Sequence, residues 1–296
     1  MRFGVQPLFH RAFTTNAGWL SAFARMAEAA GAESIWTVEH PVIAEDYEKL
    51  YSYSADGSAP FGPDTIMPDP LELLAFIAGV TSKIRLGTGI LVLPLHSPII
   101  IAKRISTIDA LSGGRMLLGI GLGWQREEFA AANVPYEERA RRTDETIEAM
   151  RALWTQAPAS YSGKHFNFKR LHLDTKPAQK SVPIIIGGST EAAARRAGRL
   201  GDGFYPYVLG PDDLGKRVEL IRATAKAAGR DPDAIEITAW PGSWKPGGSL
   251  DPKLAAEYKA AGVTRLMISA HEAGSTDLKD LETFIKKYRD EIAGPL

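Results

Sequence analysis

Residues 84–120 contain the segments IRLGTGILVL (84–93), IIIAKRISTIDAL (99–111) and RMLLGI (115–120), joined by short connections. The first and third segments are short apolar runs bounded by turn residues, which predicts buried β-strands. The middle segment repeats apolar residues at helical spacing and is long enough for three turns of helix. A strand, a helix and a second strand in this order form a βαβ unit of a parallel sheet.

The same alternation runs along the whole chain of 296 residues and gives eight strand–helix pairs. The predicted strands are Arg2–Leu8, Ser34–Val38, Ile84–Leu93, Arg115–Ile120, Val182–Ile186, Gly203–Tyr207, Ile235–Trp240 and Arg265–Ser269. The predicted helices are Trp19–Ala30, Leu71–Thr81, Ile99–Leu111, Glu137–Trp154, Glu191–Leu200, Asp212–Ala228, Lys253–Ala261 and Leu278–Ile292. An open doubly wound sheet also alternates strands with helices, but eight units favour closure. We therefore predict an α/β protein, a single (β/α)8 TIM barrel that occupies residues 1–296 as one domain.

Two connections are longer than the usual loops of an α/β protein. The first, residues 41–69 after the second strand, is rich in proline and carries Tyr47, Tyr51, Tyr53 and Phe61. We interpret it as a lid-like insertion that shapes a substrate site. The second, residues 157–181 before the fifth strand, alternates aromatic or leucine residues with polar ones. That alternation predicts a hairpin-like insertion.

The composition excludes several classes of protein. Lys plus Arg and Asp plus Glu both total 35, so the chain lacks the basic excess typical of nucleic-acid-binding proteins. No stretch approaches the roughly 20 apolar residues of a membrane-spanning helix, and Met1–Leu8 lacks the features of a secretory signal. The chain has no cysteine, which excludes disulfides, thiolate metal sites and a catalytic thiol. We expect a soluble cytoplasmic protein with a small-molecule substrate and neither a nucleic-acid nor a membrane partner.

Four of the six histidines follow predicted strands, where barrel enzymes carry their reactive groups: His10, His40, His96 and His271. Histidines at these places also cap loops and helices by hydrogen bonding. Glu39-His40 is the stronger case, because a carboxylate and an imidazole at one strand end can share proton transfer near neutral pH. Adjacent strand residues point to opposite sides, so we expect only one of the two to face the pocket. We predict His40 as the proton-handling residue; the alternative is that the pair anchors the lid.

Gly187-Gly188-Ser189-Thr190 follows the fifth predicted strand and opens a helix. Free backbone N–H groups and the positive end of the helix dipole make this a candidate phosphate site. The alternative is a tight turn with Ser189 or Thr190 as the helix cap. A rival phosphate site is the glycine-rich segment Pro241–Gly248, which carries Lys245.

Glycines also mark the third and fourth strands. Gly87 and Gly89 indicate a bulge or a ligand against the backbone, with simple packing relief as the alternative. Residues 119–124 read GIGLGW, which lacks the last glycine of a dinucleotide fingerprint. In a barrel, these glycines would let a flat ring approach the backbone beside Trp124. Three basic residues start the fourth predicted helix and either reach an anionic cofactor or form a solvated helix face: Arg139, Arg141 and Arg142.

Taken together, the motifs resemble the luciferase-like monooxygenase family, in the branch that uses the deazaflavin coenzyme F420 in place of FMN. The resemblance covers nearly the whole chain. It is carried by Glu39-His40-Pro41, Leu86–Pro94, His96-Ser97-Pro98, Leu111–Arg115 leading into Gly119–Trp124, Arg139–Glu145 and Pro183–Gly188.

The resemblance implies a tricyclic ring standing in the barrel mouth. A non-prolyl cis peptide in the strand-three bulge braces the ring in this family, and here it would fall at Gly89–Ile90. The implied ring contacts are Thr88, Gly89, Ile90, Gly121, Gly123 and Trp124, and the implied phosphate contacts are Gly187, Gly188, Ser189 and Thr190. Glu39 and His40 match the acidic residue and histidine placed near the hydride-carrying carbon. Some relatives have aspartate in place of Glu39, so the proton donor stays open between the two.

A deazaflavin carries carbon where a flavin has the nitrogen that supports oxygen activation, so the resemblance implies hydride transfer. We predict an F420-dependent oxidoreductase acting on a small organic substrate, and by resemblance a homodimer. The nearest alternative is an FMN-dependent monooxygenase on the same barrel. A metal-dependent barrel hydrolase or isomerase using His40 and His271 is a second alternative, disfavoured because no His-x-His pair occurs. A third is a deazaflavin-binding protein without catalysis.

Overall fold

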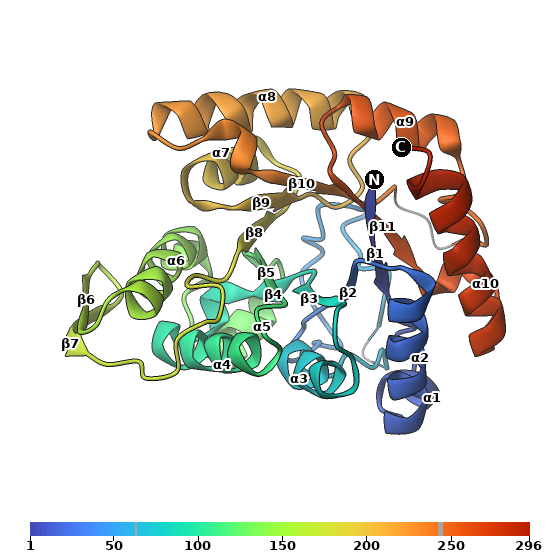
Figure 1. Cartoon of the computed structure of the whole chain (residues 1–296). Helices are drawn as coiled ribbons and strands as arrows, with labels where there is room; N and C mark the ends of the chain where they lie inside the picture. Colours follow the sequence, from blue (N-terminus) through green and yellow to red (C-terminus); the bar gives the residue numbers. More distant parts are fainter. Residues whose placement is uncertain (63, 242–244) are drawn as a thin grey trace.

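Eight parallel strands form a closed barrel with helices packed around its outside, as in a TIM barrel (Figure 1). The computed structural model describes residues 1–62, 64–241 and 245–296. Strand β1 (Arg2–Gln6) pairs with β2 (Ser34–Thr37) on one side and with β11 (Arg265–Ser269) on the other. The order continues from β11 through β10, β9 and β8 to β5, and pairing of β3 with β5 closes the ring. The predicted fold class is therefore confirmed.

Each predicted strand is present, with ends that differ by at most two residues. The remaining barrel strands are β3 (Arg85–Thr88), β4 (Leu91–Val92), β5 (Met116–Gly121), β8 (Ile184–Gly187), β9 (Gly203–Tyr205) and β10 (Glu236–Ala239). The predicted strand Ile84–Leu93 is divided into β3 and β4 by a cis peptide bond between Gly89 and Ile90. The non-prolyl cis bond expected at this position is confirmed.

Helices follow the strands as predicted, and short helical turns add to them. The helices are α1 (Arg11–Thr14), α2 (Ala17–Ala30), α3 (Pro70–Val80), α4 (Pro98–Leu111), α5 (Arg126–Ala131), α6 (Arg139–Thr155), α7 (Glu191–Leu200), α8 (Pro211–Ala227), α9 (Pro252–Ala260) and α10 (Leu278–Tyr288). The sequence did not reveal α1 and α5, because one or two turns show too little periodicity. Two predicted helices were too long: a 3-10 turn (Tyr136–Glu138) precedes α6, and a π-helical turn (Arg289–Ala293) follows α10. None of the described helices is both long and apolar enough to cross a membrane.

Trp36 is part of the buried cluster inside the barrel, and glycines make room for its ring. A Cβ atom added at Gly87 would lie 2.4 Å from the Trp36 ring, and one added at Gly4 would lie 2.7 Å from its Nε1 atom. Trp36 Nε1 donates to Ser34 Oγ at 2.7 Å, so the buried indole N–H has a partner. Gly87 therefore relieves packing against the indole, whereas Gly89 belongs to the bulge.

An ionic network closes the amino end of the barrel. The Arg265 guanidinium is fully buried and donates to Glu33 at 2.8 Å through both Nε and Nη2. Its Nη2 also donates to Glu236 at 3.1 Å. Because Arg265 and Glu236 begin their strands and Glu33 precedes β2, these charges lie at the end of the barrel opposite the strand carboxyl ends.

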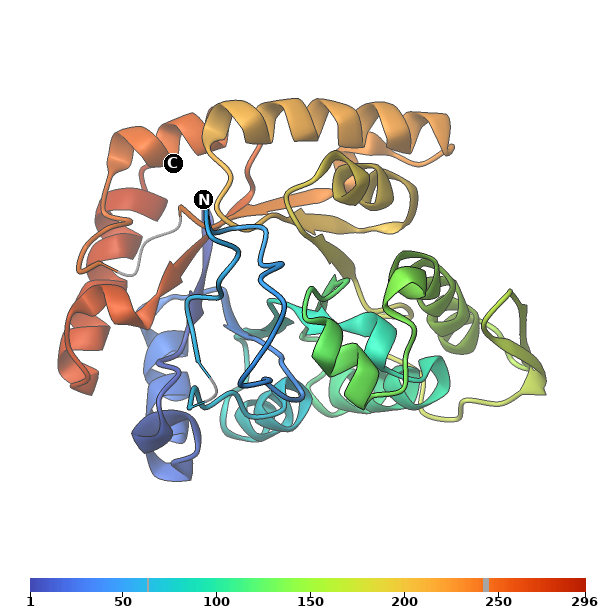
Figure 2. The same ribbon diagram turned by 180° about the vertical axis from the view of Figure 1, so that it is seen from behind.

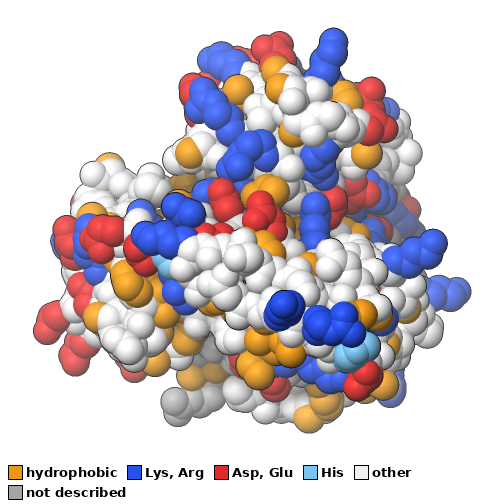
Figure 3. All heavy atoms as spheres, turned by 90° about the vertical axis from the view of Figure 1, so that its left-hand side faces the viewer, with side chains coloured by type: hydrophobic (Ala, Val, Ile, Leu, Met, Phe, Trp, Pro, Cys, Tyr) orange, Lys and Arg blue, Asp and Glu red, His pale blue; other side chains and the backbone are white. Residues whose placement is uncertain are grey.

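The two long connections differ in structure. Residues 41–69 have no helix or strand in their described part and pass across the barrel as a coil, drawn in blue in Figure 2. Residues 157–181 contain the antiparallel hairpin of β6 (Ala159–Ser162) and β7 (Asn167–Leu171), as predicted. The hairpin projects from the barrel on the left of Figure 1. The face on that side mixes acidic and basic side chains (Figure 3), with ion pairs such as Lys164–Glu138.

Candidate functional site

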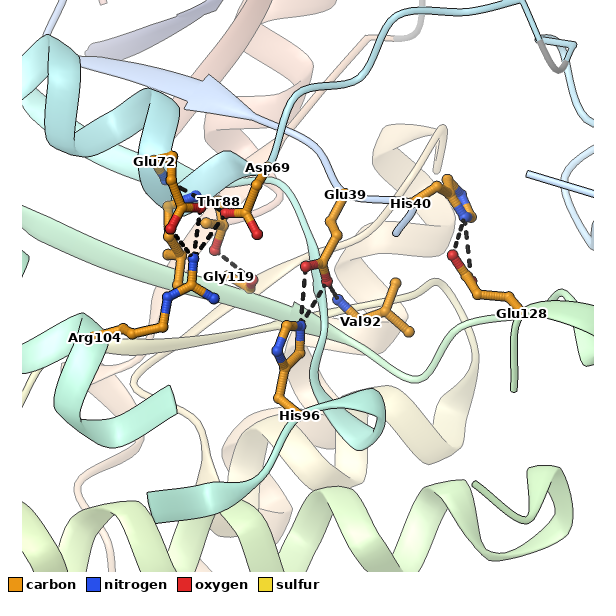
Figure 4. Close-up of polar contacts among 11 residues, drawn as sticks. Glu39, His40, Asp69, Glu72, Thr88, Val92, His96, Arg104, Gly119 and Glu128 are labelled. Atoms are coloured by element: carbon orange, nitrogen blue, oxygen red, sulfur yellow. Dashed lines mark hydrogen bonds and ion pairs between the residues drawn. The ribbon is translucent and has the colours of Figure 1, made fainter. Parts of the chain in front are cut away.

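Glu39 and His40 lie just beyond β2, after Val38, and point in different directions (Figure 4). The Glu39 carboxylate is buried, accepts a hydrogen bond from the Val92 backbone N–H at 2.6 Å and pairs with His96 Nε2 at 2.9 Å. The Glu39 backbone N–H donates to the Ile90 carbonyl at 3.1 Å. Glu39 thus contacts the strand-three bulge through its backbone and β4, which follows the bulge, through its side chain.

His40 faces a second carboxylate. Its Nδ1 atom lies 3.3 Å from each oxygen of Glu128, which sits on α5 and is only 1% exposed. The imidazole also packs against Phe61 and Trp124, with ring centroids 5.2 Å and 5.9 Å away. A carboxylate beside Nδ1 favours the proton on that nitrogen and orients the ring, which leaves Nε2 to exchange a proton with a ligand.

A cavity of about 290 Å³ lies beside His40, between the first part of the lid and its last part. It is lined by Thr15, His40, Pro41, Val42, Ile43, Thr65, Ile66, Met67 and Pro68. His40 therefore borders a space large enough for a small organic molecule. Glu39 is not among the lining residues, so of the predicted pair only His40 faces this cavity.

Ile90 occupies the space beside the glycines of two neighbouring strands. A Cβ atom added at Gly121 would lie 2.6 Å from the Ile90 side chain, and one at Gly187 would lie 2.7 Å from it. At Gly123, where φ is +76°, a Cβ atom would lie 2.7 Å from Phe129 and from Val92. Gly121 and Gly123, predicted as ring contacts, and Gly187, predicted as a phosphate contact, therefore admit apolar side chains of the protein against the backbone. Their contact with a cofactor stays a prediction.

Aromatic side chains of the lid pack on Trp124, which follows β5. The ring centroids of Tyr47 and Tyr51 lie 5.2 Å and 5.4 Å from that of Trp124, both edge-on. Tyr51 also approaches Tyr207, beyond β9, at 6.3 Å. Burial raises the pKa of Tyr51 far above its usual range, so its phenol stays neutral. Trp124 thus links the lid to the barrel mouth.

The predicted phosphate segment has the geometry of a glycine turn followed by a capped helix. Gly188 has φ +100°, which favours glycine, and a Cβ atom there would meet nothing nearer than 3.4 Å. Thr190 caps α7 by accepting from the Ala193 N–H, and Ser189 Oγ donates to the Tyr207 carbonyl at 2.7 Å. Arg217 Nε donates to the Ser189 carbonyl at 3.1 Å, which brings a cation to this turn.

Several predicted residues are engaged within the protein. Thr88 is fully buried and donates to the Gly119 carbonyl at 2.6 Å (Figure 4), so its side chain braces β3 against β5. Arg139 stacks on Tyr136 at 3.7 Å, and Arg141 pairs with Glu145 at 3.0 Å. Arg142 lies over the Phe166 ring at 5.0 Å. All three arginines therefore contact neighbouring residues of the protein, which favours the helix-face alternative over a cofactor contact.

The other histidines have separate surroundings. His10 caps α1 by accepting from the Ala12 N–H at 3.2 Å. Burial and the neighbouring His10 lower the pKa of His271, which favours its neutral form. Within residues 1–62, 64–241 and 245–296, no three His, Cys, Asp or Glu side chains converge as a metal ligand set. Part of the rival phosphate segment Pro241–Gly248 lies outside the described residues.

Sequence reasoning missed Glu128, the role of His96 as partner of Glu39, and Arg217. Glu128 follows Trp124 by four residues, and a prediction of the short helix α5 would have been needed to bring it toward His40. His96 was recognised as a strand-end histidine, but pairing with Glu39 depends on how residues 93–96 turn after β4. No local pattern distinguishes Arg217 from the other charged residues of α8.

Unpartnered polar atoms near the mouth are compatible with a bound planar cofactor. Gln125, directly after Trp124, is completely buried, and neither atom of its side-chain amide has a hydrogen-bond partner among the described residues. The same holds for Trp124 Nε1 and for Gln6 Oε1 at the end of β1. Buried polar groups are nearly always paired in native proteins. The pyrimidine edge of a flavin or deazaflavin carries both donors and acceptors, so the residues fit such a group.

The model of a known family, described as luciferase-like monooxygenase, matches residues 1–241. The chain belongs to this family. The uncharacterized protein Rv0953c of Mycobacterium tuberculosis is 32% identical over 90% of this chain and 92% of its own length. An F420-dependent hydroxymycolic acid dehydrogenase of the same species is 32% identical, over 77% of this chain and 59% of the relative. An FMNH(2)-dependent dimethylsulfone monooxygenase of Pseudomonas putida is 35% identical, over 52% of this chain and 43% of the relative.

Solved structures share the fold. The coenzyme F420 dependent tetrahydromethanopterin reductase from Methanopyrus kandleri superposes with a TM-score of 0.74 at 18% identity, covering 99% of both chains. The relatives similar in sequence thus include one named for F420 and one named for FMNH(2). The comparisons establish the family and the barrel fold.

Proposed function

We propose that this protein is an oxidoreductase that transfers hydride between coenzyme F420 and a small organic substrate, with His40 carrying the accompanying proton. The observation that carries the proposal is the His40–Glu128 pair, which lies at the carboxyl end of β2 and borders the lid cavity. Barrel enzymes carry their chemistry at this end of the strands. An imidazole with one nitrogen fixed by a carboxylate and the other available is suited to general acid–base work.

The cofactor would be held by the strand ends around the bulge. The backbone at Gly89–Ile90, with Gly121, Gly123 and Trp124 on the neighbouring strand exit, would contact the ring. Gln125 would supply hydrogen bonds to the ring edge, because its buried amide has no partner among the described residues. The turn at 187–190 and the first turn of α7 would hold the phosphate, with Arg217 beside that turn.

The side chains of the site then have distinct roles in the reaction. A reduced deazaflavin, when bound, supplies a hydride from its ring carbon. His40 Nε2 donates the proton that the substrate gains, or accepts it in the reverse direction. Glu128 orients the imidazole through Nδ1. Glu39 positions the bulge through Val92 and Ile90, and the lid excludes water from the mouth.

An FMN-dependent monooxygenase is the second candidate, favoured by the match to an FMNH(2)-dependent relative. F420 is preferred here because the F420-dependent relative covers 77% of this chain, against 52% for the FMNH(2)-dependent one. The two candidates differ in the cofactor that binds more tightly, which purified protein would reveal directly. A protein that prefers FMN would exclude the F420 proposal.

The deciding experiment is an equilibrium titration of the purified protein with F420 and with FMN, each followed by fluorescence. We expect tighter binding of F420. Gly188→Asp should weaken F420 binding at least about tenfold, since a carboxylate beside the phosphate costs more than 1.4 kcal/mol. Unchanged affinity in this variant would remove the phosphate site at residues 187–190.

Two control variants separate charge from backbone strain in this titration. Gly188→Asn adds a side chain of similar size without charge, and asparagine tolerates a left-handed backbone. Gly79→Asp adds the same charge on α3, where a Cβ atom would meet nothing within 4 Å. We expect Gly188→Asn to weaken binding less than Gly188→Asp, and Gly79→Asp to leave it unchanged. Binding of neither cofactor by the wild-type protein would overturn the proposed function.

A further inference from the structure

We infer that the lid acts as a gate, in which Tyr51 and Tyr53 lie across the path of the cofactor and must swing away before it enters. Both tyrosines belong to the lid tip, residues 47–59 of the coil that crosses the barrel (Figure 2). The inference rests on the proposed function, because it places the cofactor between Trp124 and the turn at residues 187–190. It adds a regulatory step, in which side chains of the protein compete with the cofactor for one place.

Tyr51 crosses the mouth at the exit of β8. Its ring centroid lies 5.4 Å from that of Trp124, after β5, and 6.3 Å from that of Tyr207, after β9. Because β8 pairs with β5 on one side and with β9 on the other, these contacts lie on opposite sides of the β8 exit. Tyr51 is only 9% exposed, so its side chain fills this part of the mouth. A planar cofactor that runs from Trp124 to the turn after β8 would meet the Tyr51 ring.

Tyr53 covers the turn itself. Its hydroxyl oxygen lies 3.9 Å from the point where a Cβ atom at Gly188 would stand, and its ring packs on Tyr207 with centroids 4.8 Å apart. Burial raises the pKa of Tyr53, while contacts with the side chain and the backbone of Ser189 act against the rise, so the phenol oxygen faces Ser189. Backbone N–H groups at the start of a helix are the groups that bind a phosphate. The Tyr53 hydroxyl and a phosphate would therefore compete for the Ser189 N–H.

The lid tip is held together by its own hydrogen bonds. The Tyr51 N–H donates to the Gly57 carbonyl at 3.0 Å, and the Ala59 N–H donates to the Tyr47 hydroxyl at 3.0 Å. Gly57 has φ +73°, a left-handed conformation that favours glycine and closes this turn. A compact loop of this length keeps its shape through local contacts. The tip can therefore leave the barrel as one piece, without breaking the hydrogen bonds that shape it.

The polar contacts between the lid tip and α5 lie at the beginning of the tip. The Glu48 N–H donates to the Glu127 carboxylate at 2.9 Å, and the Glu48 carboxylate pairs with Arg126 at 3.1 Å. Tyr53, further along the chain, is 40% exposed and lies at the rim of the mouth. Rotation of the chain about residues 48–50 would thus lift both gate tyrosines away from the mouth and leave the barrel core closed.

Such a gate has consequences for binding that can be measured. The affinity for the cofactor is reduced by the fraction of molecules in which the tip is open. The observed rate of association reaches a plateau at high cofactor concentration, because opening of the tip becomes the slow step. Removing the Tyr53 hydroxyl should raise both the affinity and the plateau rate. If the hydroxyl were instead a ligand of the phosphate, its removal would lower the affinity.

The first test is stopped-flow binding of F420 and of FMN to wild-type protein and to Tyr53→Phe. The substitution keeps the ring and its packing on Tyr207 and removes only the hydroxyl. We expect the plateau rate to rise and the dissociation constant to fall, each about two- to tenfold, which is the usual net effect of one hydrogen bond. Tyr161→Phe is the matched control, because it removes a hydroxyl that donates to Glu148 at 2.8 Å beside the hairpin. It should change neither value.

The second test follows the gate tyrosines directly. Tyrosines would be replaced by 3-fluorotyrosine, and the two fluorine signals would be assigned by their loss in Tyr51→Phe and in Tyr53→Phe. FMN and riboflavin share one ring system, and only FMN carries the phosphate. We expect saturating F420 or FMN to shift both signals toward the position of an exposed tyrosine. Riboflavin should shift the Tyr51 signal and leave the Tyr53 signal close to its original position.

Two results would overturn the inference: equal or weaker cofactor binding by Tyr53→Phe, or a Tyr53 signal that stays in place when a cofactor saturates the protein. The proposed function fails separately if FMN binds more tightly than F420, and the gate is then tested with FMN. Failure of wild-type protein and Tyr53→Phe to bind either cofactor would exclude both the proposed function and the gate.

Discussion

Two glutamate–histidine pairs lie side by side at the barrel mouth and begin from adjacent residues of one strand exit (Figure 4). In the first, both oxygens of Glu39 are engaged, by the Val92 N–H and by His96. In the second, Glu128 faces one nitrogen of His40, and the His40 ring borders the lid cavity. The first pair holds the backbone in place, and the second is placed to exchange a proton.

The comparison shows that the same two residue types take their role from what surrounds them. Glu39 contacts the bulge at the Ile90 carbonyl through its backbone and β4 at the Val92 N–H through its side chain, so loss of the side chain would release Val92. His40 contacts ring side chains and a cavity, so its loss would leave the strands intact. Variants of the two pairs should therefore separate into effects on turnover and effects on structure.

The largest expected effect is on turnover in His40→Ala. General acid–base groups contribute about 10² to 10⁴ in rate, so kcat should fall by that factor. The cofactor dissociation constant and Tm should stay close to wild type, because His40 makes no backbone hydrogen bond through its side chain in the structure described here. Steady-state kinetics and cofactor titration measure both. An equal loss of kcat in His96→Ala, with cofactor affinity retained, would contradict the assignment of proton exchange to the His40–Glu128 pair alone.

The next effect is on stability in Glu39→Ala. A hydrogen bond to a charged group contributes about 1.5–3 kcal/mol, so we expect the free energy of unfolding to drop by about 2–3 kcal/mol. Cofactor affinity should fall with it, while kcat at saturating cofactor changes less than in His40→Ala. Urea unfolding and the titration test this. A kcat loss as large as that of His40→Ala, with normal stability, would make Glu39 a proton-transfer residue.

A smaller effect is expected in Glu128→Gln. The amide keeps the shape but replaces one of the two carboxylate oxygens that face His40 Nδ1, so it orients the ring less firmly; kcat should fall about tenfold while cofactor affinity stays unchanged. Glu128→Asp keeps the charge and should recover part of the lost kcat, which a merely structural role would not predict. Full activity in Glu128→Gln would show that the Glu128 carboxylate is not needed to orient His40.

The smallest effect concerns the opposite end of the barrel, which serves as a reference for the two pairs. Burial disfavours the charged form of Glu33, but hydrogen bonding and attraction to Arg265 outweigh it and hold the pKa of Glu33 below its usual range. A depressed folded-state pKa gives stability that is present above the unfolded pKa of about 4.3 and is lost as the pH falls below it. Tm of the wild-type protein should therefore fall as the pH is lowered from 5 to 3. The fall should be smaller in Glu33→Gln, which lacks the carboxylate.

This last variant should leave kcat at neutral pH unchanged, because Glu33 lies before β2 at the amino end of the barrel. A marked loss of kcat in Glu33→Gln would show that the two ends are coupled, and would weaken the assignment of turnover effects to the mouth alone.

Much of the architecture was accessible from local patterns. Buried strands of a parallel sheet are apolar on both faces, so runs such as RMLLGI were identified within one or two residues of β5. The position of the cis bond at Gly89–Ile90 followed from the family resemblance, since strand three otherwise looked continuous. Short α5 gave no usable period, and with it the partner of His40 was missed.

The sequence by itself determined the order of strands and helices, the two insertions, and the positions of Glu39 and His40 at a strand end. Those features depend on residues close together in the chain, where periodicity and turn chemistry act. Only the tertiary structure decided which carboxylate faces which histidine. Glu128 lies 88 residues from His40, and Glu39 lies 57 residues from His96. Closure of the barrel brings these side chains together, and local patterns carry no record of such distances.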